Sequence, residues 1–174
     1  MVTAYVRGYL KKKDAKEKKY AAFHIVQNDS DYSIFIDTET TTDIYQNLKV
    51  GFYMVCYKEN TLVEIGFFYV PERCTKEEIT ILKSYCVKNR VALYEHNHFI
   101  EKVFFKYALF KKALCVFFNA PFDISRIAIA SSFTKGGKFH NGFSFTLTKN
   151  KSYPRIKITA NCSDNALIEF CTAA

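Results

Sequence analysis

The stretch Ser33-Ile34-Phe35-Ile36-Asp37-Thr38-Glu39-Thr40 decides the fold. Its apolar, β-branched first half is typical of a buried strand. Residues two apart in an extended strand point to the same side, so Asp37 and Glu39 are expected on one face, roughly 6.6 Å apart along the strand. Two such carboxylates repel one another, and a divalent cation such as Mg²⁺ or Mn²⁺ relieves that repulsion. A solvated pair of carboxylates just past a strand is the simpler interpretation of this stretch taken alone.

A second polar element follows another apolar run. Residues 113–118 read as a buried strand, and Asn119 stands at its end, where ligands collect in α/β sheets. Pro121 suits the first turn of a helix, which we expect to continue to about Ser131 and to carry Asp123 in its first turn. If the two strands are neighbours, Asp123 converges with Asp37 and Glu39. Three carboxylates at one point predict a metal site.

The rest of the chain predicts a layered α/β fold. Residues 51–58 and 61–70 read as a hairpin, and 142–159 as a strand pair followed by a strand at 166–170. Apolar spacing predicts helices over 76–88, with Thr75 and Glu78 as a capping box, and over 97–111. Two further strands, 3–10 and 20–27, would flank a lysine-rich turn. We therefore expect an N-terminal β extension over 1–30 and one domain over 31–174 that ends in a β-hairpin extension.

Composition excludes several classes of protein. The chain has 174 residues, enough for one domain, and its 49% apolar and 24% charged residues argue against disorder. The longest uncharged apolar stretch, residues 113–122, is far shorter than the ~18 residues of a membrane helix. The N-terminus also lacks the apolar core of a signal peptide. We expect a soluble, cytoplasmic protein that does not bind a membrane.

The excess positive charge is concentrated in one segment. The formal net charge is +8, and the window 124–163 holds seven basic residues and no acid. Uneven basic charge favours a polyanionic partner, although a surface kept soluble by lysine explains it as well. Phe139, Phe143 and Tyr153 are interleaved with these charges, so the window could follow a single strand by charge and stacking.

Other metal or phosphate motifs are weak. Six cysteines include no C-x-x-C pair, which argues against zinc, and disulfides are not expected without a secretory signal. His96 and His98 lack a partner cluster. The segment Gly136-Gly137-Lys138 lacks the flanking residues of a phosphate-binding loop.

The two carboxylate segments resemble a known family. Residues 35–40, Phe-Ile-Asp-Thr-Glu-Thr, look like the first motif of the DEDD 3′–5′ exonucleases, and residues 117–126, Phe-Phe-Asn-Ala-Pro-Phe-Asp-Ile-Ser-Arg, look like the second. The resemblance is closest to the proofreading exonuclease domain of family-B DNA polymerases and polymerase-like exonucleases. It covers about residues 30 to 132 well. It implies a ribonuclease H-like fold, in which a mixed five-stranded sheet has helices on both sides.

The resemblance also implies a two-ion Mg²⁺ or Mn²⁺ site that hydrolyses the 3′ end of single-stranded DNA. Asp37 would bridge both ions, Glu39 would share the ion that activates water, and Asp123 would hold the second ion through water. Asn119 would contact the terminal nucleotide, and Phe122 would be either a core residue or a wedge beside the last base. The further substrate-binding residues would be Thr38, Thr40 and Arg126.

The family's third motif, a Tyr or His shortly before a fourth catalytic Asp, has no match here. After Asp123 the acids are Asp164, in a turn-like segment, and Glu169, in a strand-like one. We therefore expect a fragment of a longer polymerase-like protein, with the polymerase domain as a possible partner. Three alternatives stay open: a catalytically inactive nucleic-acid-binding module, a ribonuclease H-like endonuclease or integrase, and a structural or viral accessory protein.

Overall fold

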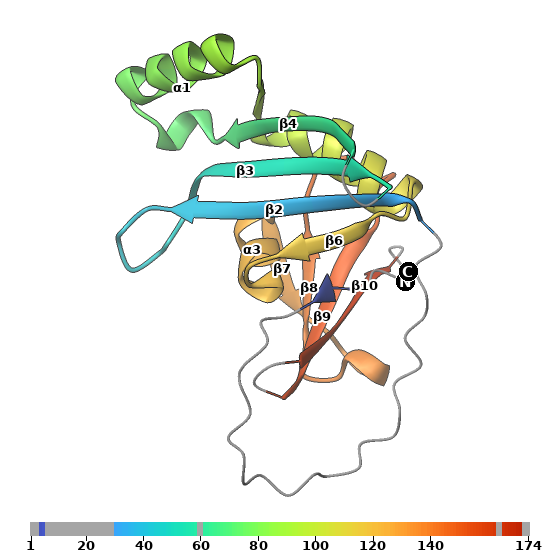
Figure 1. The fold of residues 1–174 in the computed structure, drawn as a ribbon. Coiled ribbons are helices and arrows are strands. Elements are labelled where there is room, and N and C mark those ends of the chain that lie inside the picture. Colours follow the sequence, from blue (N-terminus) through green and yellow to red (C-terminus); the bar gives the residue numbers. More distant parts are fainter. Residues whose placement is uncertain (1–3, 6–29, 59–60, 163–164, 172–174) are drawn as a thin grey trace, which may run out of the picture.

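The computed structural model describes residues 4–5, 30–58, 61–162 and 165–171, and it shows an α/β protein with two sheets (Figure 1). The first sheet is mixed, with the order β1-β6-β2-β3-β4-β5. Its strands are β1 (Ala4–Tyr5), β2 (Tyr32–Thr40), β3 (Leu48–Tyr57), β4 (Thr61–Tyr69), β5 (Ala92–Glu95) and β6 (Leu114–Phe117). The predicted α/β class with a mixed, helix-flanked sheet is confirmed.

The second sheet is antiparallel, with the order β10-β9-β8-β7. Its strands are β7 (Ala130–Phe133), β8 (Phe143–Thr146), β9 (Arg155–Cys162) and β10 (Asn165–Cys171). The helical segments are η1 (Pro71–Arg73), α1 (Lys76–Asn89), α2 (His96–His98), η2 (Phe99–Phe110), α3 (Ala120–Ile127) and η3 (Gly137–Phe139). The predicted C-terminal strands are present as β8, β9 and β10.

The N-terminal hairpin predicted from the sequence falls almost wholly outside the described residues. Of its first strand, Ala4–Tyr5 are described, and they pair in parallel with Cys115 and Val116 of β6. The second strand and the lysine-rich turn lie in residues that the structure does not describe. The division of the chain at residue 30 therefore stays a prediction.

Strands β2, β3 and β4 form an antiparallel meander that contains the predicted hairpin of residues 51–58 and 61–70. β2 pairs with β3 from Tyr32↔Tyr57 onward, and β3 pairs with β4 up to Val50↔Tyr69. The next strand in the chain, β5, pairs in parallel with β4. β5 was not predicted, because four residues between two helices, three of them half-buried and one exposed, give too short an alternation to stand out.

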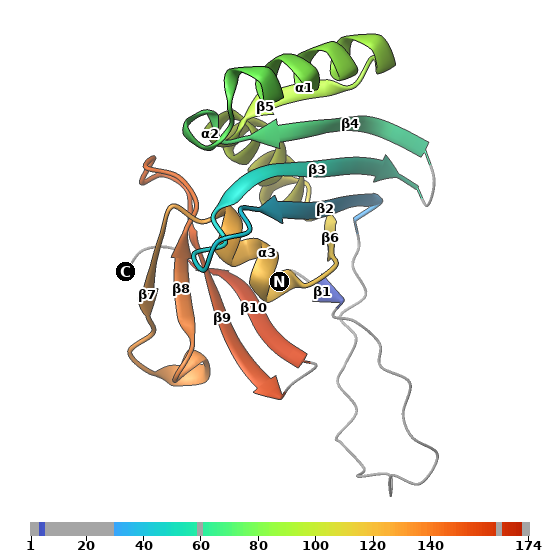
Figure 2. The same cartoon turned by 90° about the vertical axis from the view of Figure 1, so that its left-hand side faces the viewer.

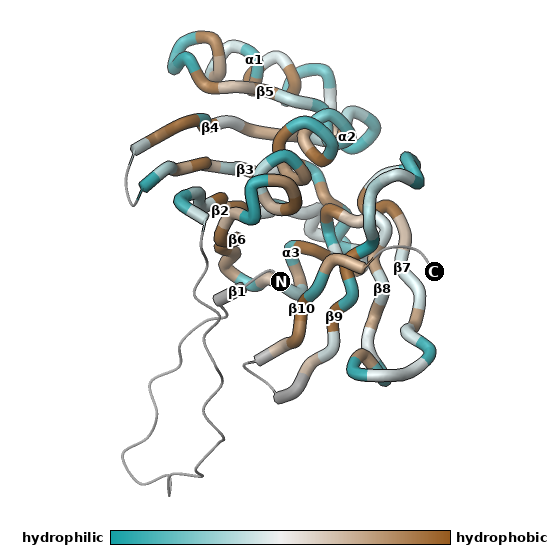
Figure 3. Tube along the Cα trace, turned by 90° about the vertical axis from the view of Figure 1, so that its right-hand side faces the viewer, coloured by the Kyte–Doolittle hydropathy of each residue, from teal (hydrophilic) through white to brown (hydrophobic). Residues whose placement is uncertain are grey.

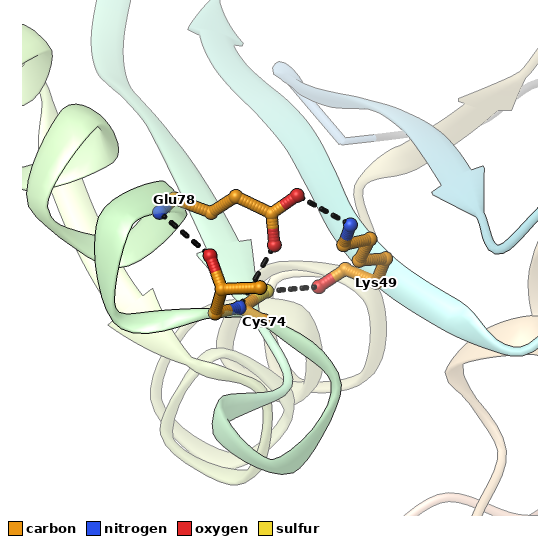
Figure 4. Close-up of polar contacts among 4 residues, drawn as sticks. Lys49, Cys74 and Glu78 are labelled. Atoms are coloured by element: carbon orange, nitrogen blue, oxygen red, sulfur yellow. Dashed lines mark hydrogen bonds and ion pairs between the residues drawn. The ribbon is translucent and has the colours of Figure 1, made fainter.

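Helix α1 begins at the predicted capping box. The Thr75 hydroxyl accepts from the Glu78 amide at 3.2 Å, and the Glu78 carboxylate accepts from the Thr75 amide at 2.8 Å (Figure 4). The same carboxylate also binds Lys49 Nζ at 2.5 Å, which lies on β3. The Cys74 thiol donates to the Lys49 carbonyl. One glutamate thus caps α1 and ties its start to the sheet.

The charge of Glu78 should be measurable in stability. Its hydrogen bond with Lys49, and then the Thr75 amide, hold the pKa of Glu78 below its ordinary value of 4.5. A lowered carboxyl pKa adds stability above pH 4.5 that is lost as the pH falls and the group is protonated. We expect Glu78→Gln to lower the melting temperature at pH 7 and the difference to shrink progressively as the pH falls below 4.5, as followed by circular dichroism. An undiminished difference at pH 3 would contradict this role.

The helical rod over 96–110 fills one face of the first sheet. The Phe99 ring of η2 stacks on Phe68 of β4 with centroids 3.9 Å apart. The Phe68 ring in turn covers Gly51 of β3, where an added Cβ would lie 2.1 Å from the ring. The predicted helix over 97–111 is present, and most of it is wound as a π-helix. Glycine at 51 lets a large ring lie flat on the strand.

The opposite face of the first sheet is half-covered. Phe67 of β4 meets Tyr85 of α1 edge to face, with centroids 5.8 Å apart, so helices lie on both faces. Phe35, Phe52 and Val116 on this face are half-buried. We expected both faces of β6 to be covered. Cys115 and Phe117, on one face, are buried, but the opposite face, which carries Val116, is only partly covered. Parts of β3, β4 and β6 show as hydrophobic in Figure 3.

Helix α3 ends earlier than predicted. It stops at Ile127, and Ala128 is already extended, with ψ 141°. The Ile129 amide then donates to the Thr146 carbonyl, and β7 pairs with β8. Pairing with β8 therefore takes residues that the sequence assigned to the helix. In Figures 1 and 2, α3 lies between the two sheets.

Both sheets share one hydrophobic cluster. Ile124 and Ile127 of α3 belong to it together with residues of β2, β6, η2 and the second sheet. The second sheet contributes Phe145, Ile156, Ile158 and Ile168, and Leu147 follows directly after β8. A small apolar cavity between β6, α3, β9 and β10 marks where these layers meet. The position of α3 is therefore fixed by packing from two sides.

Candidate active site

The candidate site lies where β2 outruns its parallel neighbour. β6 pairs with β2 from Ser33↔Leu114 to Ile36↔Phe117, and then the chain leaves the sheet and enters α3. β2 continues to Thr40 while still paired with β3 on its other side. The start of α3 occupies the place beside β2 that β6 has vacated (Figure 1). The two apolar strands are neighbours, which is the condition on which the expected approach of Asp123 to Asp37 and Glu39 depended.

Asp37 and Glu39 both face solvent at this strand end. The burial pattern of β2 alternates, with Ile34, Ile36 and Thr38 buried and the two acids exposed. β2 stays in register with β3 through Glu39, and a bulge follows at Thr40. The two carboxylates therefore share a face of the strand, opposite the side that packs on α3.

Asp123 is buried behind them, with 2% of its surface exposed. The Thr38 hydroxyl donates to Oδ1 at 2.6 Å, and the Asn119 amide donates to Oδ2 at 3.0 Å. Burial raises the pKa of Asp123, these two hydrogen bonds oppose the rise, and the negative charge of Asp37 adds to it. Asp123 therefore lies within the electrostatic reach of Asp37. Thr38 links the two residues, because it is next to Asp37 in the sequence and is hydrogen-bonded to Asp123.

The residues of this site have the ligand type that a divalent cation prefers, but they do not enclose a cation on their own. Across the part of the chain that the structure describes, no three His, Cys, Asp or Glu side chains are grouped closely enough to hold a metal ion. Mg²⁺, however, is commonly bound through one or two carboxylates, with water and substrate phosphate completing its shell. Asp37 and Glu39 supply two exposed carboxylates of that kind, whereas Asp123 is hydrogen-bonded to Thr38 on the other side of β2. The predicted cluster of all three carboxylates is therefore not seen among the described residues.

Asn119 acts as the N-cap of α3. Its Oδ1 accepts from the Phe122 amide at 3.4 Å, and its own amide is bound by Asp123. The remainder of Asn119 is exposed at the strand end where the sequence placed it. Phe122 is half-buried, with the Arg126 guanidinium 4.8 Å above its ring, so it is neither a full core residue nor a bare wedge.

Thr38 and Arg126 do work that the sequence did not reveal. Thr38 was expected to line the 3′ terminus, but its side chain points inward to Asp123. Arg126 was expected to bind substrate, and its Nη1 instead donates to the carbonyls of Tyr45 and Gln46 at 3.0 and 2.7 Å. Thr40 is half-exposed at the bulge. The loop that Arg126 holds was missed, although Asp43 between threonines and Asn47 is a turn signal.

The aromatic residues of the basic window take different places from those predicted. Phe139 is buried, and Tyr153 stacks on Phe105 with centroids 4.3 Å apart, so both serve packing. Phe143 is exposed, and its neighbour is Phe133 of β7, with centroids 5.1 Å apart. A chain that alternates aromatic and basic residues does not show which of its rings the core will take.

The remaining sequence candidates are accounted for by local contacts. His96 Nε2–H donates to the Ile127 carbonyl at 2.8 Å, and burial lowers the His96 pKa, while His98 stacks on Tyr94. Glu169 pairs with Lys138, and Asp164 lies outside the described residues. The cysteines whose side chains are described are all free thiols: Cys56, Cys74, Cys86, Cys115 and Cys171.

Comparison of the chain with protein-family models, with curated proteins and with solved structures found no match. Among the described residues, no helix combines the length and apolarity needed to cross a bilayer.

The Thr38–Asp123 bond should be a measurable source of stability. Thr38→Val keeps the shape of the side chain but leaves a buried carboxylate oxygen without its donor, which costs about 1–3 kcal/mol. Thr38→Ser keeps the hydroxyl and is the matched control. We expect urea unfolding to show a clear loss for the valine variant and a smaller one for serine. Equal stability of the two variants would show that the hydroxyl contributes nothing.

Proposed function

We propose that this chain is the exonuclease part of a polymerase-like protein, which removes nucleotides from the 3′ end of single-stranded DNA with the help of divalent ions. The observation that carries the proposal is the strand end itself. The exposed Asp37 and Glu39 of β2 and the buried Asp123 of α3 all lie where the parallel pairing of β2 and β6 stops. The two segments that resemble the exonuclease motifs, far apart in sequence, are neighbours there.

The topology supports a ribonuclease H-like assignment. An antiparallel meander (β2, β3, β4), a helical crossover and a strand (β6) added in parallel beside the first meander strand form one mixed sheet. Helices pack on both faces of that sheet. The resemblance of residues 30 to 132 implies this same order of elements.

In the proposed reaction, the side chains of this chain position the ions and the strand. Asp37 and Glu39 would bind the ions directly, and Asp123 would hold the second ion through a water molecule. When bound, the two ions supply the charge that lowers the pKa of the attacking water and stabilises the leaving 3′ oxygen. Asn119, at the strand end, would hydrogen-bond near the terminal nucleotide.

A specific observation favours a second candidate, a non-catalytic module of the same fold that binds single-stranded nucleic acid. Within the described residues, the carboxylates do not form a closed metal site, and the resemblance calls for a fourth one that these residues do not supply. The basic charge of the window 124–163 serves binding whether or not the strand is cut.

A digest of 3′-labelled single-stranded DNA separates the two candidates. We expect release of labelled mononucleotides with Mg²⁺, none with EDTA, and a loss of at least 100-fold for Asp37→Asn, because the substitution removes a charged metal ligand. Asp31→Asn, an exposed aspartate at the other end of the same segment, is the matched control and should match the wild type. Binding of the strand without release in Mg²⁺ or Mn²⁺ would favour the non-catalytic module. Release that persists in Asp37→Asn would refute the catalytic assignment.

A further inference from the structure

The loop over 41–47, between β2 and β3, presents two large apolar side chains to solvent. Ile44 is 90% exposed and Tyr45 is 70% exposed. The loop begins two residues after Glu39, so its tip extends directly from the strand that bears the exposed carboxylates. Apolar side chains this exposed gain nothing for the fold, which directs attention to what they could bind.

Hydrogen bonds fix the loop from within. Asp43 Oδ1 accepts from the Thr41 hydroxyl and from the amides of Tyr45 and Gln46, at 3.1, 2.9 and 3.1 Å. The base of the loop is closed by Thr41 and Asn47, since each backbone amide finds an oxygen of the other residue. Gln46 takes a left-handed backbone conformation, with φ 45°, that turns the chain back toward β3. The exposed tip is therefore held in one shape.

Arg126 fixes the loop from outside. Its Nη1 donates to the carbonyls of Tyr45 and Gln46, and its Nε donates to the Ser125 hydroxyl. Arg126 lies one helical turn after Asp123 on α3. Helix α3 therefore carries the buried Asp123 and also holds the loop that carries Tyr45. The position of Tyr45 relative to Asp123 is fixed by this contact.

We propose that loop 41–47 is a preformed platform for an unpaired base, on which Tyr45 stacks and beside which Ile44 packs. This inference rests on the proposed function, because it assumes a single strand whose end lies at the carboxylates of β2. Base–aromatic stacking is tolerant of sequence and works best on a ring that loses little freedom on binding. The Arg126 guanidinium lies against the backbone of the loop, and the window 124–163, to which Arg126 belongs, holds seven basic residues and no acid, a balance that suits a phosphate backbone.

Binding is measured with the full chain in EDTA, by the fluorescence anisotropy of a labelled oligothymidine, so that no cutting occurs. We expect Tyr45→Ala to weaken binding about fivefold or more and Tyr45→Phe to bind as the wild type does, because the ring and not the hydroxyl stacks. Ile44→Ser should weaken binding to a lesser degree. Each variant is first checked for an unchanged melting temperature, which separates lost binding from lost folding.

Matched controls lie on the surface of α1. Ile81→Ser and Val87→Ser remove highly exposed apolar side chains, and both should bind as the wild type does. Phe133→Ala tests the exposed aromatic pair of Phe133 and Phe143 on β7 and β8. A loss of binding with Phe133→Ala and not with Tyr45→Ala would overturn the platform in favour of the β7–β8 edge. A change in molecular mass with Tyr45→Ala, and none in binding, would assign the loop to contact between copies of the chain.

The platform and the nuclease can fail separately. Tyr45-dependent binding in EDTA together with no release of nucleotides in Mg²⁺ would keep the platform and remove the catalytic assignment. Nucleotide release that depends on Asp37, with binding unaffected by Tyr45→Ala, would keep the nuclease and remove the platform.

Discussion

The structure depends on the parallel pairing of β2 with β6, and on where that pairing stops. A parallel pair requires a long crossover, and here the meander, α1 and the helical rod over 96–110 provide it. The pairing ends at Ile36↔Phe117, and the freed edge of β2 is taken by the first turn of α3. A single hydrogen bond, from Thr38 to Asp123, closes this junction in the interior.

This junction places opposite demands on one carboxylate. Burial favours the protonated form of Asp123, while the donors from Thr38 and Asn119 favour the charged form. The donors from Thr38 and Asn119 explain how the buried carboxylate is tolerated. Asp37 and Glu39 lie on the other, solvent side of β2, where they present the two negative charges that the proposed cation would bind.

Much of the fold could be predicted because its elements carry strong local signals. The apolar, β-branched run of β2, the apolar runs of β3 and β4, and the Thr75–Glu78 capping box all led to the elements that form. Sequence also brought the two carboxylate segments together correctly, since each follows a buried strand. These features are set by residues close in the chain, and tertiary packing agrees with them.

The rest is decided by contacts between distant segments. Residues 128–131 were assigned to the helix, but β7 (Ala130–Phe133) pairs with β8, and Phe139 and Tyr153 enter the core through contacts that no local pattern predicts. An arginine such as Arg126 is a typical phosphate ligand, but its guanidinium here donates to two backbone carbonyls of a loop about 80 residues earlier in the chain. Such partners become visible only once the chain is folded.

Crystals grown with Mn²⁺ test the central claim most directly, because Mn²⁺ scatters anomalously and reports its own position. The proposed site predicts an anomalous peak within bonding distance of the carboxylates of Asp37 and Glu39, on the solvent side of β2. Crystals saturated with Mn²⁺ that show no peak there, or show it at carboxylates elsewhere on the surface, would contradict the account.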